Sequence, residues 1–224
     1  MSENIQSENI QLVNIAPQRI FKFKCEFHLL DRTLTELMKE EYDLERIKEG
    51  IKEPGTTGQT VDTRLNKKIK YQEIHDWVSK CMNQVKDTMK LNCDEIKIVQ
   101  SWGNRAETDE WHRMHYHPNA YMSSVLYFSD CWKNADTVFE IDDMWAGNGY
   151  NPFLTLHNPE MGKICIRDVV ECSMGDLLIF PSCMHHGVPA NTSSAPRYTM
   201  SFNGFPSGVV GNFDGLYGME VDIH

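Results

Sequence analysis

The sequence has no paired cysteines, little positive charge and no long apolar run. Its seven cysteines never occur as Cys-x-x-Cys, which argues against a disulfide scaffold and a structural zinc site and favours a reducing cytoplasm. The sequence has 22 lysines and arginines and 32 acidic residues. The resulting net charge of −10 gives no indication of a nucleic-acid or anionic-membrane partner. Every apolar run is far shorter than the roughly 20 residues that span a bilayer, and the acidic N-terminus lacks a secretion signal. We therefore expect a cytoplasmic protein that binds neither nucleic acid nor membranes.

The chain is long enough, and at 41 % apolar residues hydrophobic enough, to form one sizeable core. Residues 1–16 contain the tandem repeat SENIQ-SENIQ and are expected to form a flexible tail. Residues 17–224 are expected to form a single domain. Its expected parts are helical support at about 30–92, a β core at about 95–205 and a C-terminal extension at 206–224.

Hydrophobic periodicity changes from helical to β along the chain. Residues 21–28 alternate apolar and polar as in a strand, and Asp31 is expected to cap a helix that follows. Apolar residues from Ile74 to Met89 form one stripe of a second helix. From Ile96 onward about seven short β-rich runs follow, separated by turn residues. The pattern predicts a mainly β fold, an antiparallel jelly roll with N-terminal supporting helices.

Histidines are concentrated in the stretch HRMHYHPNAYMSSVLYF at residues 112–128. On a strand, residues i and i+2 point to the same side, so His115 and His117 should point together and His112 away from them. Two converging imidazoles supply two thirds of a facial metal site. A third ligand is available from the adjacent pair His185 and His186, of which only one can face the site.

Arg197 lies eleven residues beyond His186, with Thr199 on the same strand face. An arginine that points into a β core is costly unless it meets a carboxylate, which its planar guanidinium binds through two hydrogen bonds. The sequence therefore predicts a site for a metal ion and a carboxylate ligand.

In order and spacing these motifs resemble those of the 2-oxoglutarate/Fe(II)-dependent oxygenases. The similarity is greatest to a bacterial and marine-phage branch related to the prolyl hydroxylases, and it implies a double-stranded β-helix, the cupin-like form of the jelly roll. The matching segments are Ser101-Trp102, HYHPN (115–119), SSVLY (123–127), GDLLIFPS (175–182), HGVPAN (186–191) and RYTMSFN (197–203).

The resemblance implies Fe(II), 2-oxoglutarate and O2 as cofactors, with His115 and His186 as iron ligands. His117 stands where most of the wider family has the aspartate of His-x-Asp. Neutral imidazole in place of a carboxylate raises the charge at the metal by one unit, which favours an anionic cosubstrate. Two alternatives stay open, namely iron held by three histidines and iron held by two histidines and a water molecule.

The resemblance also assigns the cosubstrate pocket. Arg197 is expected to bind the far carboxylate of 2-oxoglutarate, with Thr199 and Tyr127 as hydroxyl donors, and Asn119 to position its other end. A separate group is expected near the substrate, formed by Trp102, Asn104 and Trp145, the last in the insert at 142–162.

The implied activity is that of a non-haem dioxygenase that hydroxylates an unactivated C–H bond and releases succinate and CO2. The substrate is either a protein side chain or a small metabolite. A three-histidine cupin metalloenzyme that does not use 2-oxoglutarate and a non-catalytic jelly-roll binding module are the alternatives. The expected location is the cytoplasm of a bacterium or of a phage-infected host, and the oligomeric state, with a homodimer among the options, is left open.

Overall fold

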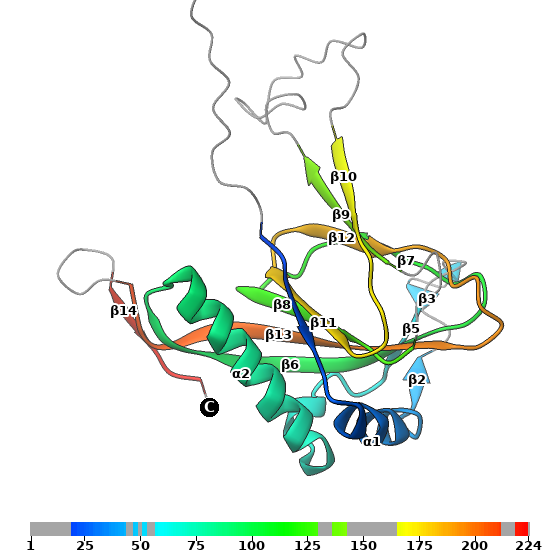
Figure 1. The fold of residues 1–224 in the computed structure, drawn as a ribbon, viewed down its shortest axis with the longest axis horizontal. Coiled ribbons are helices and arrows are strands. Elements are labelled where there is room, and N and C mark those ends of the chain that lie inside the picture. The colour runs from blue at the N-terminus through cyan, green and yellow to red at the C-terminus, as the bar shows by residue number, and fades with distance from the viewer. Residues whose placement is uncertain are drawn as a thin grey trace, which may run out of the picture.

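Two α-helices and two antiparallel β-sheets account for most of the described chain (Figure 1). The structure of the protein, a computed structural model, describes residues 19–43, 47–48, 51–52, 57–129, 136–142, 165–211 and 218–223. The expected tail at 1–16 and most of the insert at 142–162, with Trp145, lie outside these residues.

The helices are α1 (Phe27–Leu37) and α2 (Gln72–Met89), with the short 3-10 helices η1 (Leu65–Lys67) and η2 (Ile69–Tyr71) between them. The strands are β1 (Phe21–Lys24), β2 (Tyr42–Asp43), β3 (Ile47–Lys48), β4 (Ile51–Lys52), β5 (Gly58–Thr60), β6 (Cys93–Ala106), β7 (His112–His115), β8 (Met122–Tyr127), β9 (Thr137–Asp142), β10 (Cys165–Val170), β11 (Asp176–Pro181), β12 (His185–Val188), β13 (Arg197–Val210) and β14 (Met219–Val221). Neither described helix has the length and hydropathy that a membrane crossing requires.

The described strands form a large sheet, a small sheet and the separate pair β3-β4. The large sheet has the order β1-β11-β8-β13-β6-β5-β2, with β14 paired to β13, and the small sheet has the order β10-β9-β12-β7. In Figure 1 the helices lie on one side of the large sheet and the small sheet lies on the other. This arrangement is a double-stranded β-helix, which confirms the expected mainly β jelly roll with supporting helices.

The two faces of the large sheet have different chemistry, as strand β13 illustrates. Met200 and Phe202 are fully buried in the apolar core beneath the helices. Thr199 and Ser201 alternate with them and line a cavity under the small sheet. Because side chains alternate across a strand, one strand supplies both the core that supports the sheet and the polar face between the sheets.

The boundaries of the first elements differ from the expectation. Strand β1 ends at Lys24, and helix α1 already begins at Phe27, so Asp31 lies inside the helix instead of capping it. Phe27 is 67 % exposed, so the apolar alternation of the strand does not continue to this residue. Strand β1 pairs with β11 over its full length, and the pairing stops where the chain turns into α1.

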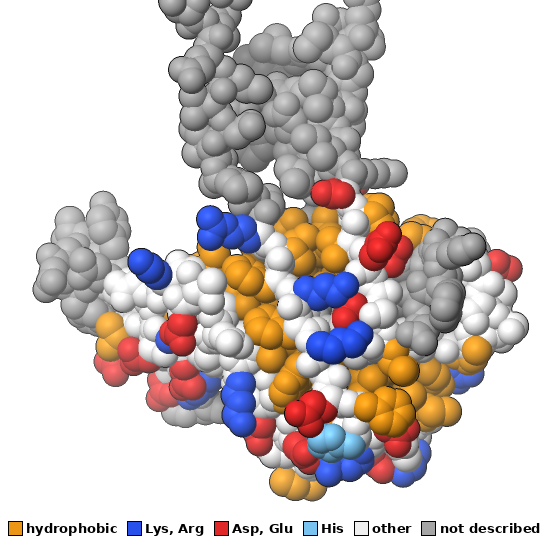
Figure 2. All heavy atoms as spheres, in the orientation of Figure 1, with side chains coloured by type: hydrophobic (Ala, Val, Ile, Leu, Met, Phe, Trp, Pro, Cys, Tyr) orange, Lys and Arg blue, Asp and Glu red, His pale blue; other side chains and the backbone are white. Residues whose placement is uncertain are grey.

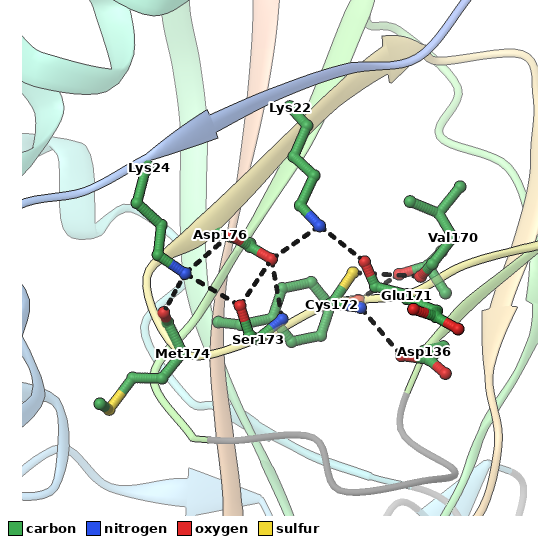
Figure 3. A network of polar contacts seen from close by, with 11 residues as sticks. Lys22, Lys24, Asp136, Val170, Glu171, Cys172, Ser173, Met174 and Asp176 are labelled. Atoms are coloured by element: carbon green, nitrogen blue, oxygen red, sulfur yellow. Dashed lines mark hydrogen bonds and ion pairs between the residues drawn. The ribbon is translucent and has the colours of Figure 1, made fainter.

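Strand β1 is held to β11 by a buried carboxylate (Figure 3). Lys22 and Lys24 each place Nζ 2.9 Å from the Asp176 carboxylate, which also accepts a hydrogen bond from the Ser173 backbone N–H. Burial raises the pKa of Asp176, but the hydrogen bonds from the two lysines and Ser173 outweigh it and lower the pKa to about 2. The carboxylate therefore stabilises the folded chain only while it is ionised.

This carboxylate gives a first prediction, for stability against pH. A folded-state pKa below the unfolded value means that the stabilisation is complete above about pH 4 and is lost as the pH falls toward 2. Asp176→Asn is expected to lower the free energy of unfolding at pH 7 by on the order of 2 kcal/mol and to flatten that acid transition. The matched change Asp87→Asn removes an exposed partner of Lys86 and should cost less than about 1 kcal/mol. Urea unfolding of the three proteins from pH 7 to pH 2.5 measures both effects, and equal losses in the two variants would contradict the assignment.

Candidate metal centre

Three imidazole rings converge between the sheets. His115 ends β7, His117 follows two residues later, and His186 lies on β12 directly opposite His115 in the strand pairing. Their potential ligand nitrogens all lie within 4.8 Å of one another. Adjacent antiparallel strands thus bring together residues that are about 70 positions apart in the sequence.

All three rings have the same hydrogen-bond pattern. In each ring Nδ1 faces a carbonyl oxygen, and a carbonyl can only accept a hydrogen bond. The assigned tautomer therefore carries its proton on Nδ1 and leaves the Nε2 lone pair free to bind a metal. The acceptors are the Arg113 backbone carbonyl for His115 at 2.8 Å, the Met184 backbone carbonyl for His186 at 2.9 Å and the Asn203 side-chain carbonyl for His117 at 2.7 Å.

The spacing of the Nε2 atoms fits a metal ion. Nε2 of His115 lies 3.0 Å from Nε2 of His117. In the assigned tautomers both atoms present lone pairs, which repel at this distance unless a cation lies against both. Two imidazole nitrogens at right angles on one ion, each about 2.1 Å from it, are about 3.0 Å apart. The donor set therefore fits a first-row divalent metal such as Fe(II).

The buried ligands are neutral at physiological pH. Burial, with a smaller contribution from the neighbouring His115, lowers the pKa of His186 to about 3. Burial also lowers the pKa of His117, although its bond to Asn203 acts in the opposite direction. Because these rings carry no positive charge at pH 7, a metal ion need not displace protons from them.

His112 faces the same side as the three ligands, so the expectation that it points away is wrong. Its ring stacks on that of His115, with centroids 4.5 Å apart and planes at 13°. The strand pairing explains this, because His186 lies opposite His115 and Val188 lies opposite His112. Between these two pairs, two residues of β7 (113 and 114) oppose the single residue Gly187 of β12, and such a bulge changes the side to which residues beyond it point.

His185 and His186 point to opposite sides of β12, as expected for neighbours on a strand. The His185 ring stacks on Tyr116, with centroids 5.4 Å apart, whereas His186 packs against His115 at 4.3 Å. Tyr116 is 55 % exposed, so its stack with His185 lies on the outer side of the small sheet.

A small cavity adjoins the three histidines. Its volume is about 30 Å³, which is room for roughly two water molecules. The residues that line it are Trp102, Asn104, His112, His115, His117, Ser124, Val125, Thr137, Phe180, His186, Val188, Thr199 and Ser201.

Asn104 organises the polar wall of this cavity. Its side-chain N–H groups donate to Thr199 Oγ1 at 3.2 Å and to Ser201 Oγ at 3.0 Å, and its oxygen accepts from Trp102 Nε1 at 3.1 Å. Each hydroxyl accepts a bond from the amide and keeps its own proton to donate. Thr199 and Ser201 can therefore donate to an anionic group bound in the cavity.

Arg197 and Tyr127 are buried next to the cavity and do not line it. Arg197 is 6 % exposed, precedes Thr199 on the same face of β13, and donates from Nη1 to the Pro189 carbonyl at 3.2 Å. The Tyr127 hydroxyl lies against the hydroxyl of Thr137, which itself lines the cavity.

Asn119 is not among the residues that line the cavity, and its expected role in positioning the cosubstrate stays a prediction. It is exposed, sits in a turn after Pro118 and has a positive φ of 59°. Asparagine adopts this left-handed conformation more readily than most residues, so the turn accounts for its presence in the motif.

A larger groove lies between α2 and β1, where Figure 2 shows apolar side chains. Its volume is about 460 Å³, and its walls include Phe21, Val85, Met89 and Tyr121. None of the described residues that line it is a histidine. The metal-binding chemistry therefore belongs to the smaller cavity.

Sequence reasoning missed four residues of the site, namely Ser201, Asn203, Thr137 and His112. Counting every second residue from Arg197 reaches Ser201 and Asn203, so the period of a strand could have found these two. No such spacing in the sequence points to Thr137, because β9 reaches the site through its pairing with β12.

Comparison with protein families gives a match. The family described as "Putative 2OG-Fe(II) oxygenase" matches residues 100–203, a range that contains the three converging histidines and Arg197. No curated protein matches the chain.

Several solved structures are similar in fold. The α-ketoglutarate-dependent epimerase SnoN of nogalamycin biosynthesis has a TM-score of 0.60 at 12 % identity, over 86 % of this chain and 80 % of its own. A Pseudomonas putida prolyl-4-hydroxylase has a TM-score of 0.53 at 12 % identity, over 85 % of this chain and 94 % of its own. HygX from Streptomyces hygroscopicus, with nickel and 2-oxoglutarate bound, has a TM-score of 0.54 at 12 % identity, over 84 % of this chain and 83 % of its own. At this identity the similarity shows a common fold.

Proposed function

We propose that the chain belongs to the 2-oxoglutarate/Fe(II)-dependent oxygenases, as the family match over residues 100–203 supports, and that it hydroxylates an unactivated C–H bond. Iron is held by His115, His117 and His186. The observation that carries the proposal is the convergence of three imidazoles in which each Nδ1 faces a carbonyl oxygen, so that three Nε2 atoms lie close together.

Residues of β13 would hold the cosubstrate. Arg197 and Thr199 would bind its far carboxylate, and Ser201 could donate from the same face of β13. Tyr127 supports this end through Thr137. Because the cavity is only about 30 Å³, binding requires side chains between the metal and Arg197 to move, as is common when ligands bind.

The cofactors supply the oxidising chemistry, since Fe(II), 2-oxoglutarate and O2 together oxidise a C–H bond and release succinate and CO2. The protein supplies orientation and a dry site. Phe180 packs on the His186 ring at 4.6 Å between centroids, and Trp102 lies 5.4 Å from the His117 ring. These apolar walls exclude water from the metal and lower the local dielectric constant.

The substrate is either a peptide side chain or a small molecule. Among proteins of similar fold, a Trichoplax adhaerens prolyl hydroxylase was crystallised with a peptide fragment, and HygX was crystallised with hygromycin B. Trp102 and Asn104 are the described candidates for contact with the substrate. We also propose a cytoplasmic location, which the free thiols of the five cysteines among the described side chains support.

Turnover of 2-oxoglutarate tests the proposal. The purified protein, reconstituted with Fe(II) in air, is expected to convert 2-oxoglutarate slowly to succinate without any added substrate, because one chain carries the whole site. Succinate is measured by NMR, with the His115→Ala variant as the control that should form none. Metal-loaded protein that neither binds nor consumes 2-oxoglutarate would favour a three-histidine cupin enzyme. Protein that binds no metal would favour a non-catalytic binding module.

A further inference from the structure

His117 differs from the other two ligands in what holds its ring. The Nδ1 partners of His115 and His186 are backbone carbonyls two residues earlier in the chain, which no side-chain substitution removes. His117 Nδ1 instead faces the side-chain oxygen of Asn203 on strand β13, 2.7 Å away. The ring that replaces the usual carboxylate is therefore the one whose orientation depends on a side chain.

The Asn203 amide is itself held in place. Its Nδ2 lies 3.4 Å from the Gln100 side-chain oxygen on the neighbouring strand β6, which leaves Oδ1 directed at His117. Ser123 lies 3.0 Å from Asn203 Oδ1 and 2.9 Å from His117 Nδ1, and a further bond joins its hydroxyl to Ser182. His117, Ser123, Ser182 and Asn203 are all buried, so water does not readily replace a lost partner.

We infer that Asn203 is the positioning residue that makes His117 the third metal ligand. Its carbonyl oxygen accepts the Nδ1 proton, which fixes the tautomer and aims Nε2 at the metal. This inference rests on the proposed function, because it assumes that the three histidines hold the iron. It favours three histidines over two histidines and water as the ligand set.

The neutral amide also determines the charge of the site. An aspartate at position 203 would offer the same acceptor with a negative charge, and a carboxylate bound to Nδ1 makes an imidazole a stronger ligand. The site lacks the negative charge of the usual aspartate ligand, because His117 stands in its place. Asn203 orients His117 without adding a negative charge of its own.

Metal affinity of the apoprotein, titrated with Co(II) by calorimetry, tests the inference independently of activity. Asn203→Ala is expected to weaken Co(II) binding by about 10- to 100-fold, as losses of residues that orient a ligand do. Asn203→Asp is expected to bind at least as tightly as the wild type. The visible spectrum of the Co(II) protein should change in the alanine variant, because water replaces one imidazole.

Asn83→Ala is the matched control. Asn83 also bonds through its side chain to a strand, accepting from the Ile96 backbone N–H and donating to the Ile96 carbonyl, but it lies on α2 outside the metal centre. Its loss should lower the melting temperature and leave Co(II) affinity within twofold of the wild type.

The outcomes separate the two claims. Wild-type affinity in Asn203→Ala, or an aspartate variant as weak as the alanine variant, overturns the inference while the proposed function stands. Wild-type protein that binds no Co(II) overturns the proposed function and the inference with it. Should the variants fail to fold, ¹⁵N NMR of the imidazoles of the wild-type apoprotein decides, because a proton on Nε2 of His117 is incompatible with the proposed role.

Discussion

His186→Ala is expected to abolish metal binding at the three-histidine site, whereas His185→Ala should leave it nearly unchanged. The His186 ring is buried and faces His115 and His117, but the His185 ring stacks on Tyr116 on the outer side of the small sheet. Removing a direct ligand costs more than the roughly 10- to 100-fold loss that follows removal of an orienting partner. We therefore expect more than 100-fold weaker binding for His186→Ala and less than threefold for His185→Ala.

Anaerobic calorimetric titration with Fe(II) measures both affinities, with melting temperatures to verify folding. The two variants control for each other, since they remove the same side chain from adjacent positions of β12. Exchanged effects would mean that β12 is displaced by one residue relative to β7 and β9, because such a shift turns every side chain to the other face.

Arg197→Ala is expected to weaken 2-oxoglutarate binding by about 30-fold or more while leaving iron affinity unchanged. Loss of a buried, charge-assisted pair costs on the order of 2–5 kcal/mol, and 2 kcal/mol corresponds to about 30-fold in affinity. Arg197→Lys should recover only part of this loss, because an ammonium keeps the charge but not the planar pair of donors.

Titration of 2-oxoglutarate into Mn(II)-loaded protein measures the effect without turnover. Arg105→Ala is the matched control, because Arg105 is the neighbour of Asn104 on β6, its guanidinium lies over the Tyr198 ring, and it bonds to Glu107. The control should bind 2-oxoglutarate as the wild type does. Wild-type affinity in Arg197→Ala would make this arginine structural, with its bond to the Pro189 carbonyl as its role.

Strand spacing predicted much of the metal centre, and it failed where the strand is irregular. His115 and His117 meet as two residues of one face should, and only one of His185 and His186 joins them. His112 does not follow the alternation of side chains along a strand, because β7 has a bulge. The bulge arises from the pairing of β7 with β12, so the sequence of β7 alone does not predict it.

The residues that motif resemblance assigned to the cosubstrate differ in where the structure places them. Thr199 lines the cavity, Arg197 and Tyr127 lie buried beside it, and Asn119 lies in an exposed turn. A residue in a motif can be needed for the backbone conformation of a turn or for contact with a ligand. The residue type alone does not tell which of these roles it has.

By itself the sequence determined the mainly β architecture, the supporting helices and the residue types that can bind iron and a carboxylate. These follow from periods of two and 3.6 residues and from side-chain chemistry, which are local properties. Only the tertiary structure decided that His112 faces the metal centre, that Asn203 holds His117, and that Asp176 joins β1 to β11. Each of these depends on contacts between strands far apart in the chain, and such contacts are set by register and bulges that no local pattern contains.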